Sequence, residues 1–169
     1  MQLDKLGAQF QAVLPPHISV DRFKRVVLTA VSTNPELLNC DQRSLWNACM
    51  KAATDGNEPD GRYAALVIFK TKDGPIAQYM PMVMGVLRRA RNSGEISYIN
   101  AHVVYDGDTF EHYIDDKGEH FKHTPNWRGD RGEPFAVYAV ARDKEGNSYV
   151  EPMSKAQVER VRQTSRAKD

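Results

Sequence analysis

The first third of the chain carries hydrophobic residues at helical spacing. A helix is expected up to about Val13, where Leu14-Pro15-Pro16 interrupts the pattern. Ser19 is a suitable N-cap for a second helix, which Asn34-Pro35 would end. A third helix is expected over residues 41–53. The pattern therefore predicts a helical N-terminal region.

The segment from 58 to 94 predicts a turn, two strands and a helix. Glu58-Pro59-Asp60-Gly61 has turn composition, and strands over 62–70 and 76–80 follow it. Pro81 suits the first turn of a helix, because its missing N–H would have no partner there. Apolar residues recur on one side of this helix, and they are Met80, Val83, Met84, Leu87 and Ala90.

Beyond residue 95 the hydrophobic period changes to two. Short strands are expected over 96–105, 109–114, 119–123, 135–142 and 148–150. Asp106-Gly107 and Asp116-Lys117-Gly118 would form hairpin turns between them. A last helix over about 153–166 would direct Val158 and Val161 inward. The prediction for residues 1–169 is a single α+β domain, in which antiparallel hairpins pack with N-terminal helices, a central helix and a C-terminal helix.

Composition limits the class of protein. A chain of 169 residues with 41% hydrophobic and 27% charged residues is typical of one globular domain that needs no disulfide or metal. Neither a signal peptide nor an apolar run of about 20 residues is visible, so a cytoplasmic protein without a membrane partner is expected. Cys40 and Cys49 lack CxxC spacing and are expected to be small buried residues.

Charge is concentrated, although the formal net charge is only +1. The basic residues of segment 58–94 are Arg62, Lys70, Lys72, Arg88, Arg89 and Arg91. Helical spacing would leave Arg88 and Arg91 free to project together. Segment 106–119 instead holds six acidic residues and one lysine. A basic face of this kind could bind a phosphate backbone, while the acidic face could contact another copy of the chain.

Binding of single-stranded nucleic acid requires cations along the backbone and flat groups against which bases stack. The loop 126–132 places Trp127 beside two arginines and two glycines. The predicted DNA contacts are Arg62, Lys70, Lys72, Gln78, Tyr79, Arg88, Arg89, Arg91, Tyr98, Trp127 and Arg128.

Each candidate also has a structural interpretation. The helix arginines could form a solvated face, and Arg62 could form an ion pair with Asp60. Lys70 and Lys72 could simply keep a hairpin tip soluble. Trp127 could pack over a sheet edge instead of stacking on a base.

Enzymatic chemistry finds little support in the sequence. His112, His120 and His123 lie near acidic residues but form no compact metal motif. Ile68 stands where a nuclease with a Pro59-Asp60 turn would need its second carboxylate. No Walker lysine motif or GxSxG elbow is present. No catalytic residue and no cofactor are therefore expected, with Mg²⁺ considered only as a counterion of DNA.

Three runs make the chain similar to a known family: PDGRYAALVIFK, QYMPMVMGVLRRARNSGEI and AHVVYDGDTFEHY. They resemble the RecT family of phage and prophage single-strand annealing recombinases, in the broader group that includes Redβ. The resemblance extends upstream through RVVLTAVSTNPELLNCDQRSLWNACMKAATDG and downstream through GEPFAVYAVARDKEGN and VEPMSKAQVERVR. Such proteins usually continue past the helix matching 153–166, so this chain is expected to be a core region without the C-terminal extension, either as a fragment or as a naturally short member.

The resemblance implies an activity rather than a reaction. It implies ATP-independent binding of single-stranded DNA and annealing of complementary strands in homologous recombination, by a ring or filament of identical subunits. The implied partners are single-stranded DNA, the annealed duplex, further copies of the chain and a phage-type 5′–3′ exonuclease. Two alternatives remain open: a metal-dependent enzyme that processes nucleic acid, and an oligomeric adaptor without affinity for DNA.

Overall fold

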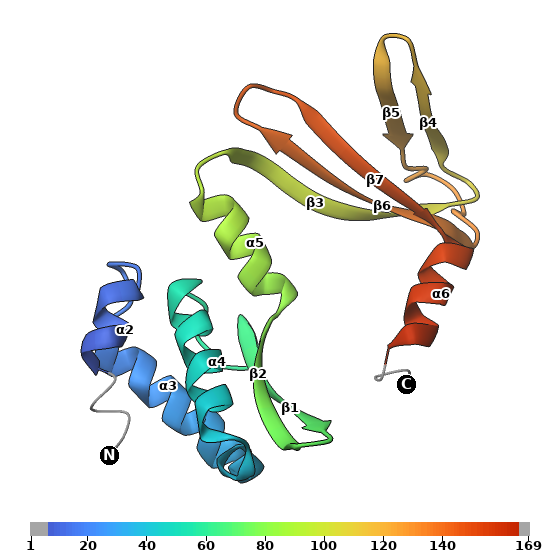
Figure 1. Ribbon diagram of the computed structural model, residues 1–169. Helices are drawn as coiled ribbons and strands as arrows, with labels where there is room; N and C mark the ends of the chain where they lie inside the picture. Colours follow the sequence, from blue (N-terminus) through green and yellow to red (C-terminus); the bar gives the residue numbers. More distant parts are fainter. Residues whose placement is uncertain (1–6, 166–169) are drawn as a thin grey trace. The chain divides into compact units, whose positions relative to one another are not determined.

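A computed structural model describes residues 7–165 of the chain (Figure 1). The described residues form two compact units, which divide between Ser93 and Gly94. Both units combine helices with antiparallel strands, which confirms the predicted α+β class. A single domain over residues 1–169 stays a prediction.

The first unit begins with three α-helices and a short 3₁₀ helix: α2 (Gly7–Val13), α3 (Val20–Thr33), η1 (Pro35–Asn39) and α4 (Gln42–Thr54). Ser19 caps α3, since its hydroxyl accepts a hydrogen bond from the Arg22 N–H. Asp41 caps α4 in the same way. The three predicted helices are confirmed, while η1 was not expected. The part of the first helix predicted before Gly7 lies outside the described residues.

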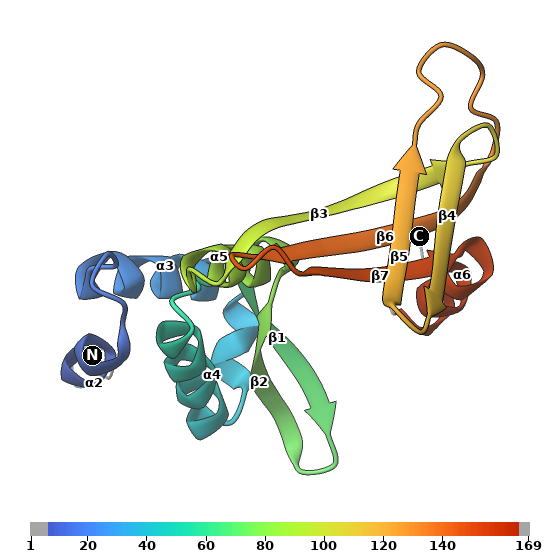
Figure 2. The same ribbon diagram turned by 90° about the horizontal axis from the view of Figure 1, so that it is seen from above.

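A β-hairpin follows the helices. Strands β1 (Ala64–Thr71) and β2 (Gly74–Pro81) pair in antiparallel register, and α4 lies alongside β2 in both views (Figures 1 and 2). The turn before β1 is as predicted: the Asp60 carboxylate accepts the N–H groups of Arg62 and Tyr63, and Gly61 has a φ of 78°.

The helix after the hairpin, α5 (Val83–Asn92), begins later than predicted. Pro81 is the last residue of β2, and the Met82 N–H still donates to the Tyr63 carbonyl oxygen across the hairpin. Strand pairing therefore continues past the proline, and the prediction that Pro81 occupies the first helical turn was wrong.

The core of the first unit lies between the helices and the hairpin. Phe10 and Phe23 are completely buried, with ring centroids 5.2 Å apart. Helix α4 buries one side, and Leu66 and Ala77 of the hairpin contribute to the same core. The buried residues of α4 are Leu45, Ala48, Cys49, Ala52 and Ala53. Both cysteines are buried as expected, and burial raises the pKa of the Cys49 thiol to about 12.

The second unit contains a sheet and a separate hairpin. Strands β3 (Ile96–Tyr105), β6 (Pro134–Asp143) and β7 (Ser148–Ser154) form an antiparallel sheet in the order β3-β6-β7. Strands β4 (Thr109–Asp115) and β5 (Gly118–Thr124) pair only with each other in the described part of the chain, and they run across the direction of that sheet (Figure 2).

The Asp106-Gly107 turn does not form the hairpin that the sequence predicted. It connects β3 to β4, which belong to different sheets. The Asp106 and Gly107 N–H groups donate to carbonyl oxygens of Glu133 and Arg131, so the turn pairs with the loop before β6. These bonds redirect the chain from one sheet to the other.

An aromatic cluster joins the β4–β5 hairpin to the sheet. Phe110 and Phe121 of the hairpin lie 5.6 and 5.0 Å, between ring centroids, from Tyr138 of β6. The hairpin therefore covers the part of the sheet that holds Val104, Tyr138 and Val140. Tyr138 is the central residue of this second core.

The last helix, α6 (Lys155–Thr164), starts at a capping box made by Ser154 and Gln157. Val158 and Val161 are 37% and 58% exposed, so the prediction that they point inward was wrong. The predicted end at residue 166 lies beyond the described residues. No helix within residues 7–165 is long and apolar enough to span a membrane.

Candidate nucleic-acid interface

Helix α5 contacts the rest of the first unit through a glycine rather than through its large apolar residues. Gly85 is buried, and a Cβ there would collide with the Tyr63 carbonyl oxygen. The predicted apolar side is instead open, since Val83 and Met84 are 74% and 39% exposed. Close approach of the backbone at Gly85 selects which side faces the unit, and that side carries Arg88 one turn later.

Arg88 is held inside the first unit. Its Nη2 donates to the Gly56 carbonyl oxygen, and its guanidinium carbon lies 4.1 Å from the Tyr63 ring centroid. The side chain is half-buried. The prediction that Arg88 projects freely beside Arg91 was therefore wrong, whereas Arg91 is exposed and forms no ion pair within residues 7–165.

Arg89 forms part of a polar network with Asp55 and Tyr79. The Arg89 Nη1 lies 2.8 Å from Asp55 Oδ2, and the arginine side chain remains 54% exposed. The Tyr79 hydroxyl donates to the same carboxylate and accepts from the Asn57 amide. Burial raises the pKa of Tyr79, whose ring packs against the core. Tyr79 therefore lacks the exposed ring that base stacking would need.

An open hollow of about 780 Å³ borders these side chains. Arg88 and Arg89 line it together with His17 and Asp55. Two guanidinium groups next to one carboxylate leave a positive balance, which suits an anionic ligand. The carboxylate offsets part of the charge that Arg89 brings.

The remaining candidates of the first unit lie on its surface. Arg62 is exposed, with its guanidinium carbon 5.4 Å from the Tyr63 ring centroid, and its link to Asp60 runs through the backbone N–H. Lys70, Lys72 and Gln78 are exposed along or beside the hairpin. Arg62, Lys70 and Lys72 form no ion pair in the part of the chain that the structure describes.

Three candidates belong to the second unit. Tyr98 on β3 is 43% exposed, and its hydroxyl accepts from the Asn100 amide. Trp127 is 80% exposed in the loop 125–133, which excludes the alternative that it packs over a sheet edge within this unit. Arg128 beside it is exposed. Contact of DNA with any of these residues stays a prediction.

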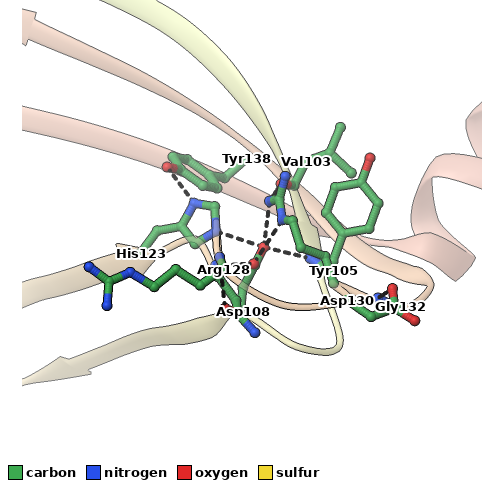
Figure 3. Close-up of polar contacts among 10 residues, drawn as sticks. Val103, Tyr105, Asp108, His123, Arg128, Asp130, Gly132 and Tyr138 are labelled. Carbon is green, nitrogen blue, oxygen red and sulfur yellow. Dashed lines mark hydrogen bonds and ion pairs between the residues drawn. The ribbon is translucent and has the colours of Figure 1, made fainter.

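Asp108 was expected to belong to an acidic surface, but its side chain is completely buried. The Arg131 Nε and Nη2 donate to the two carboxylate oxygens over 2.9 and 2.6 Å. These bonds hold the pKa of Asp108 well below its usual range. Figure 3 shows His123 between this carboxylate and the Tyr138 hydroxyl. The sequence gives no spacing signal for the pair, because 23 positions separate Asp108 from Arg131.

The three histidines considered as metal ligands lie apart in their contacts. His112 pairs with Glu119, His120 with Asp115, and His123 with Asp108. Within residues 7–165 no three His, Cys, Asp or Glu side chains gather as a metal site. The metal-dependent alternative therefore has no ligand set among these histidines.

Comparison with known proteins identifies the family of this chain. The protein-family model described as "RecT family" matches residues 21–169. The chain belongs to the RecT family. This RecT-family chain is 34% identical over 167 residues to "Protein RecT" of Escherichia coli (strain K12). The match covers 94% of this chain and 61% of that protein, so the chain spans less than two thirds of the length of its RecT relative.

Proposed function

We propose that this RecT-family chain binds single-stranded DNA and anneals complementary strands in phage-type recombination without ATP. The observation that carries the proposal is a set of exposed cations in the turn before the hairpin, on the hairpin and on the helix after it, which form no ion pair within residues 7–165: Arg62, Lys70, Lys72 and Arg91. Cations without an internal ion pair can neutralise phosphates and release counterions. Arg89 adds a partly exposed charge beside them.

The mechanism needs no bond-making or bond-breaking chemistry. Neutralised phosphates repel a complementary strand less, so two strands can approach each other on the protein surface. Base pairing then supplies the driving energy, at about 1.4 kcal/mol of stacking for each base-pair step. The protein therefore acts as a recombination mediator rather than an enzyme.

Self-association extends this mechanism along a strand. Val83 and Val86 on α5 are 74% and 52% exposed, and apolar residues in such positions support contacts between copies of the chain. Head-to-tail contacts of identical subunits close into rings or grow into filaments. A cytoplasmic setting, a phage-type 5′–3′ exonuclease as supplier of single strands, and Mg²⁺ only as a counterion of DNA complete the proposal.

The test mixes two complementary labelled oligonucleotides with the protein in the absence of ATP. Faster pairing, measured by energy transfer between the labels, is expected, and the strands should stay intact on a denaturing gel with Mg²⁺. A variant with Lys72→Ala and Arg91→Ala should anneal more slowly than a matched variant with Arg25→Ala and Arg43→Ala. Both variants lose two positive charges, but Arg25 and Arg43 lie on α3 and α4.

Three outcomes would contradict the proposal. Strand cleavage that a chelator abolishes would indicate the metal-dependent enzyme. Oligomers without affinity for single strands would indicate an adaptor. Equal loss of annealing in the two matched variants would show that the segment 58–94 has no special role.

A further inference from the structure

The loop 125–133 is anchored at several points to the start of the β4–β5 hairpin. The Arg131 guanidinium binds the buried Asp108 carboxylate through two hydrogen bonds, and the Asn126 N–H donates to the same carboxylate over 2.9 Å (Figure 3). Gly107 allows this close approach, since a Cβ there would lie 2.7 Å from the Asp130 carbonyl oxygen. A long loop that projects beyond the strands in Figure 2 is therefore fixed at its base.

This anchored loop exposes a large aromatic ring. Trp127 is 80% exposed, whereas the other tryptophan of the chain, Trp46, packs against the core of the first unit. The Arg131 guanidinium carbon lies 5.2 Å from the Trp127 ring centroid and 4.2 Å from that of Tyr105. The indole is thus supported by a cation that Asp108 holds in place.

An exposed indole gives up the stabilisation that burial would provide. Its rigid presentation, however, lowers the entropy cost of binding a flat partner. Arg128, next in the chain, is exposed and forms no ion pair among the described residues, so a cation is available for a phosphate beside the ring. The loop also holds two acids, of which Asp130 accepts the Gly132 N–H and Glu133 faces Lys155 at 3.9 Å. A flat group attached to a phosphate fits this combination.

We propose that Trp127 is a stacking site for an unpaired nucleobase, with Asp108 and Arg131 as the residues that position it. The inference rests on the proposed function, because it requires that the chain binds single-stranded DNA. It adds a site on the second unit that contacts a base as well as the phosphate beside it. Stacking is tolerant of sequence, since every base has an aromatic face.

The test uses a Trp46→Phe variant, whose sequence contains Trp127 as its only tryptophan. Oligo(dT) and an abasic oligonucleotide of equal length are titrated into it. We expect oligo(dT) to quench the fluorescence of Trp127 and the abasic strand to leave it nearly unchanged. In the parent chain, Trp127→Ala should lower the affinity for oligo(dT) at least about fivefold. It should leave the affinity for the abasic strand unchanged, and Trp127→Tyr should restore most of the preference for oligo(dT).

The positioning role is tested with Arg131→Lys, which keeps the charge but loses the paired hydrogen bonds to Asp108. This variant should bind the abasic strand as the parent does and lose the preference for oligo(dT). If the role of Arg131 were merely structural, Arg131→Lys would lower the affinities for oligo(dT) and for the abasic strand equally. Asp108→Asn provides a second variant with the same expectation.

Failure of this inference can be told from failure of the proposed function. If the parent chain binds neither oligonucleotide, both proposals fall. If it binds both oligonucleotides without quenching of Trp127 fluorescence, the stacking site is wrong and the annealing proposal stands. The same conclusion follows if Trp127→Ala lowers the affinities for both oligonucleotides equally. Lower stability of Trp127→Ala with unchanged DNA binding would indicate a protein contact instead.

Discussion

Arg88 lies over the ring of Tyr63, with its guanidinium carbon 4.1 Å from the ring centroid, and donates to the carbonyl oxygen of Gly56. The contact joins helix α5 to the segment that enters the hairpin. Arg91, three positions later on the same helix, has no ion pair within residues 7–165. Two arginines of one basic run therefore have different environments, and substitutions should separate their roles.

Arg88→Ala should lower the stability of the protein, while Arg91→Ala should not. The first change removes a half-buried cation–π contact and a hydrogen bond, at a cost of about 1–2 kcal/mol. The second should leave the free energy of unfolding unchanged within about 0.5 kcal/mol. Arg91→Ala should instead reduce the salt dependence of DNA binding by about one unit of slope. Denaturant titrations and binding isotherms at several salt concentrations measure both effects, and a reversed pattern would refute the assignment.

Removal of the carboxylate at Asp55 should strengthen DNA binding. Asp55→Asn frees Arg89 from its ion pair and removes a negative charge from the hollow that Arg88 and Arg89 line. An increase in affinity of about two- to fivefold at low salt is expected, as for the loss of one exposed ion pair. Tyr79→Phe is the control, because it removes the other hydrogen bond to Asp55 without changing charge. Weaker binding by Asp55→Asn would show that Arg89 does not face DNA.

The stabilisation that Asp108 provides should depend on pH. Its pKa is lowered in the folded protein from the ordinary value of 3.8, chiefly by the hydrogen bonds from Arg131. Above about pH 5 the carboxylate is ionised in both states, so its contribution is complete. As the pH falls further, the unfolded chain takes up the proton first, and the contribution decreases.

Asp108→Asn is the variant that tests this dependence. The stability difference between the parent and Asp108→Asn should be greatest near neutral pH and should shrink as the pH falls below about 5. Urea titrations across this range give the comparison. Asp116→Asn removes one exposed negative charge of the same segment and serves as the reference. A difference that grows toward low pH would contradict the buried pair.

Gly85→Ala should disturb the packing of helix α5 against the rest of the first unit. The added Cβ would meet the Tyr63 carbonyl oxygen and the Asn57 amide, so the helix has to move away from the hairpin. A loss of about 1–3 kcal/mol is expected from this overpacking. Val83→Ala, at a position that is 74% exposed, should change stability by less than about 0.5 kcal/mol. Thermal unfolding of the two variants is the measurement. Equal stability of Gly85→Ala and Val83→Ala would contradict the close contact of Gly85 with the Tyr63 carbonyl oxygen.

Local signals in the sequence predicted most elements of the fold. Ser19 caps its helix as expected, and the alternation after residue 95 predicted the strands. The buried side of α5 could not be predicted, because the largest apolar side chains were assumed to face inward. Gly85 determines which side of α5 is buried, because the absence of a side chain leaves space for the Tyr63 carbonyl oxygen. Tyr63 lies 22 positions earlier in the chain, so helical spacing alone does not reveal this contact.

The candidate site was predictable in composition but not in detail. The sequence located the basic segment, and Arg62, Lys70, Lys72 and Arg91 are exposed as a contact surface requires. It could not show that Tyr79 is tied to Asp55, nor that Asp108 leaves the acidic surface to bind Arg131. Both pairs join residues far apart in the chain, and a charge count treats each member as a separate surface group.

The first turn of α4 is bonded to the outer edge of β2. The Asp41 N–H donates to the Pro75 carbonyl oxygen over 2.9 Å, and the Ser44 hydroxyl accepts the Ala77 N–H. These backbone groups would otherwise be available to a strand from another molecule. Along the stretch from Pro75 to Ala77, the edge of β2 is thus protected against pairing with strand edges of other molecules and against the aggregation that such pairing would cause.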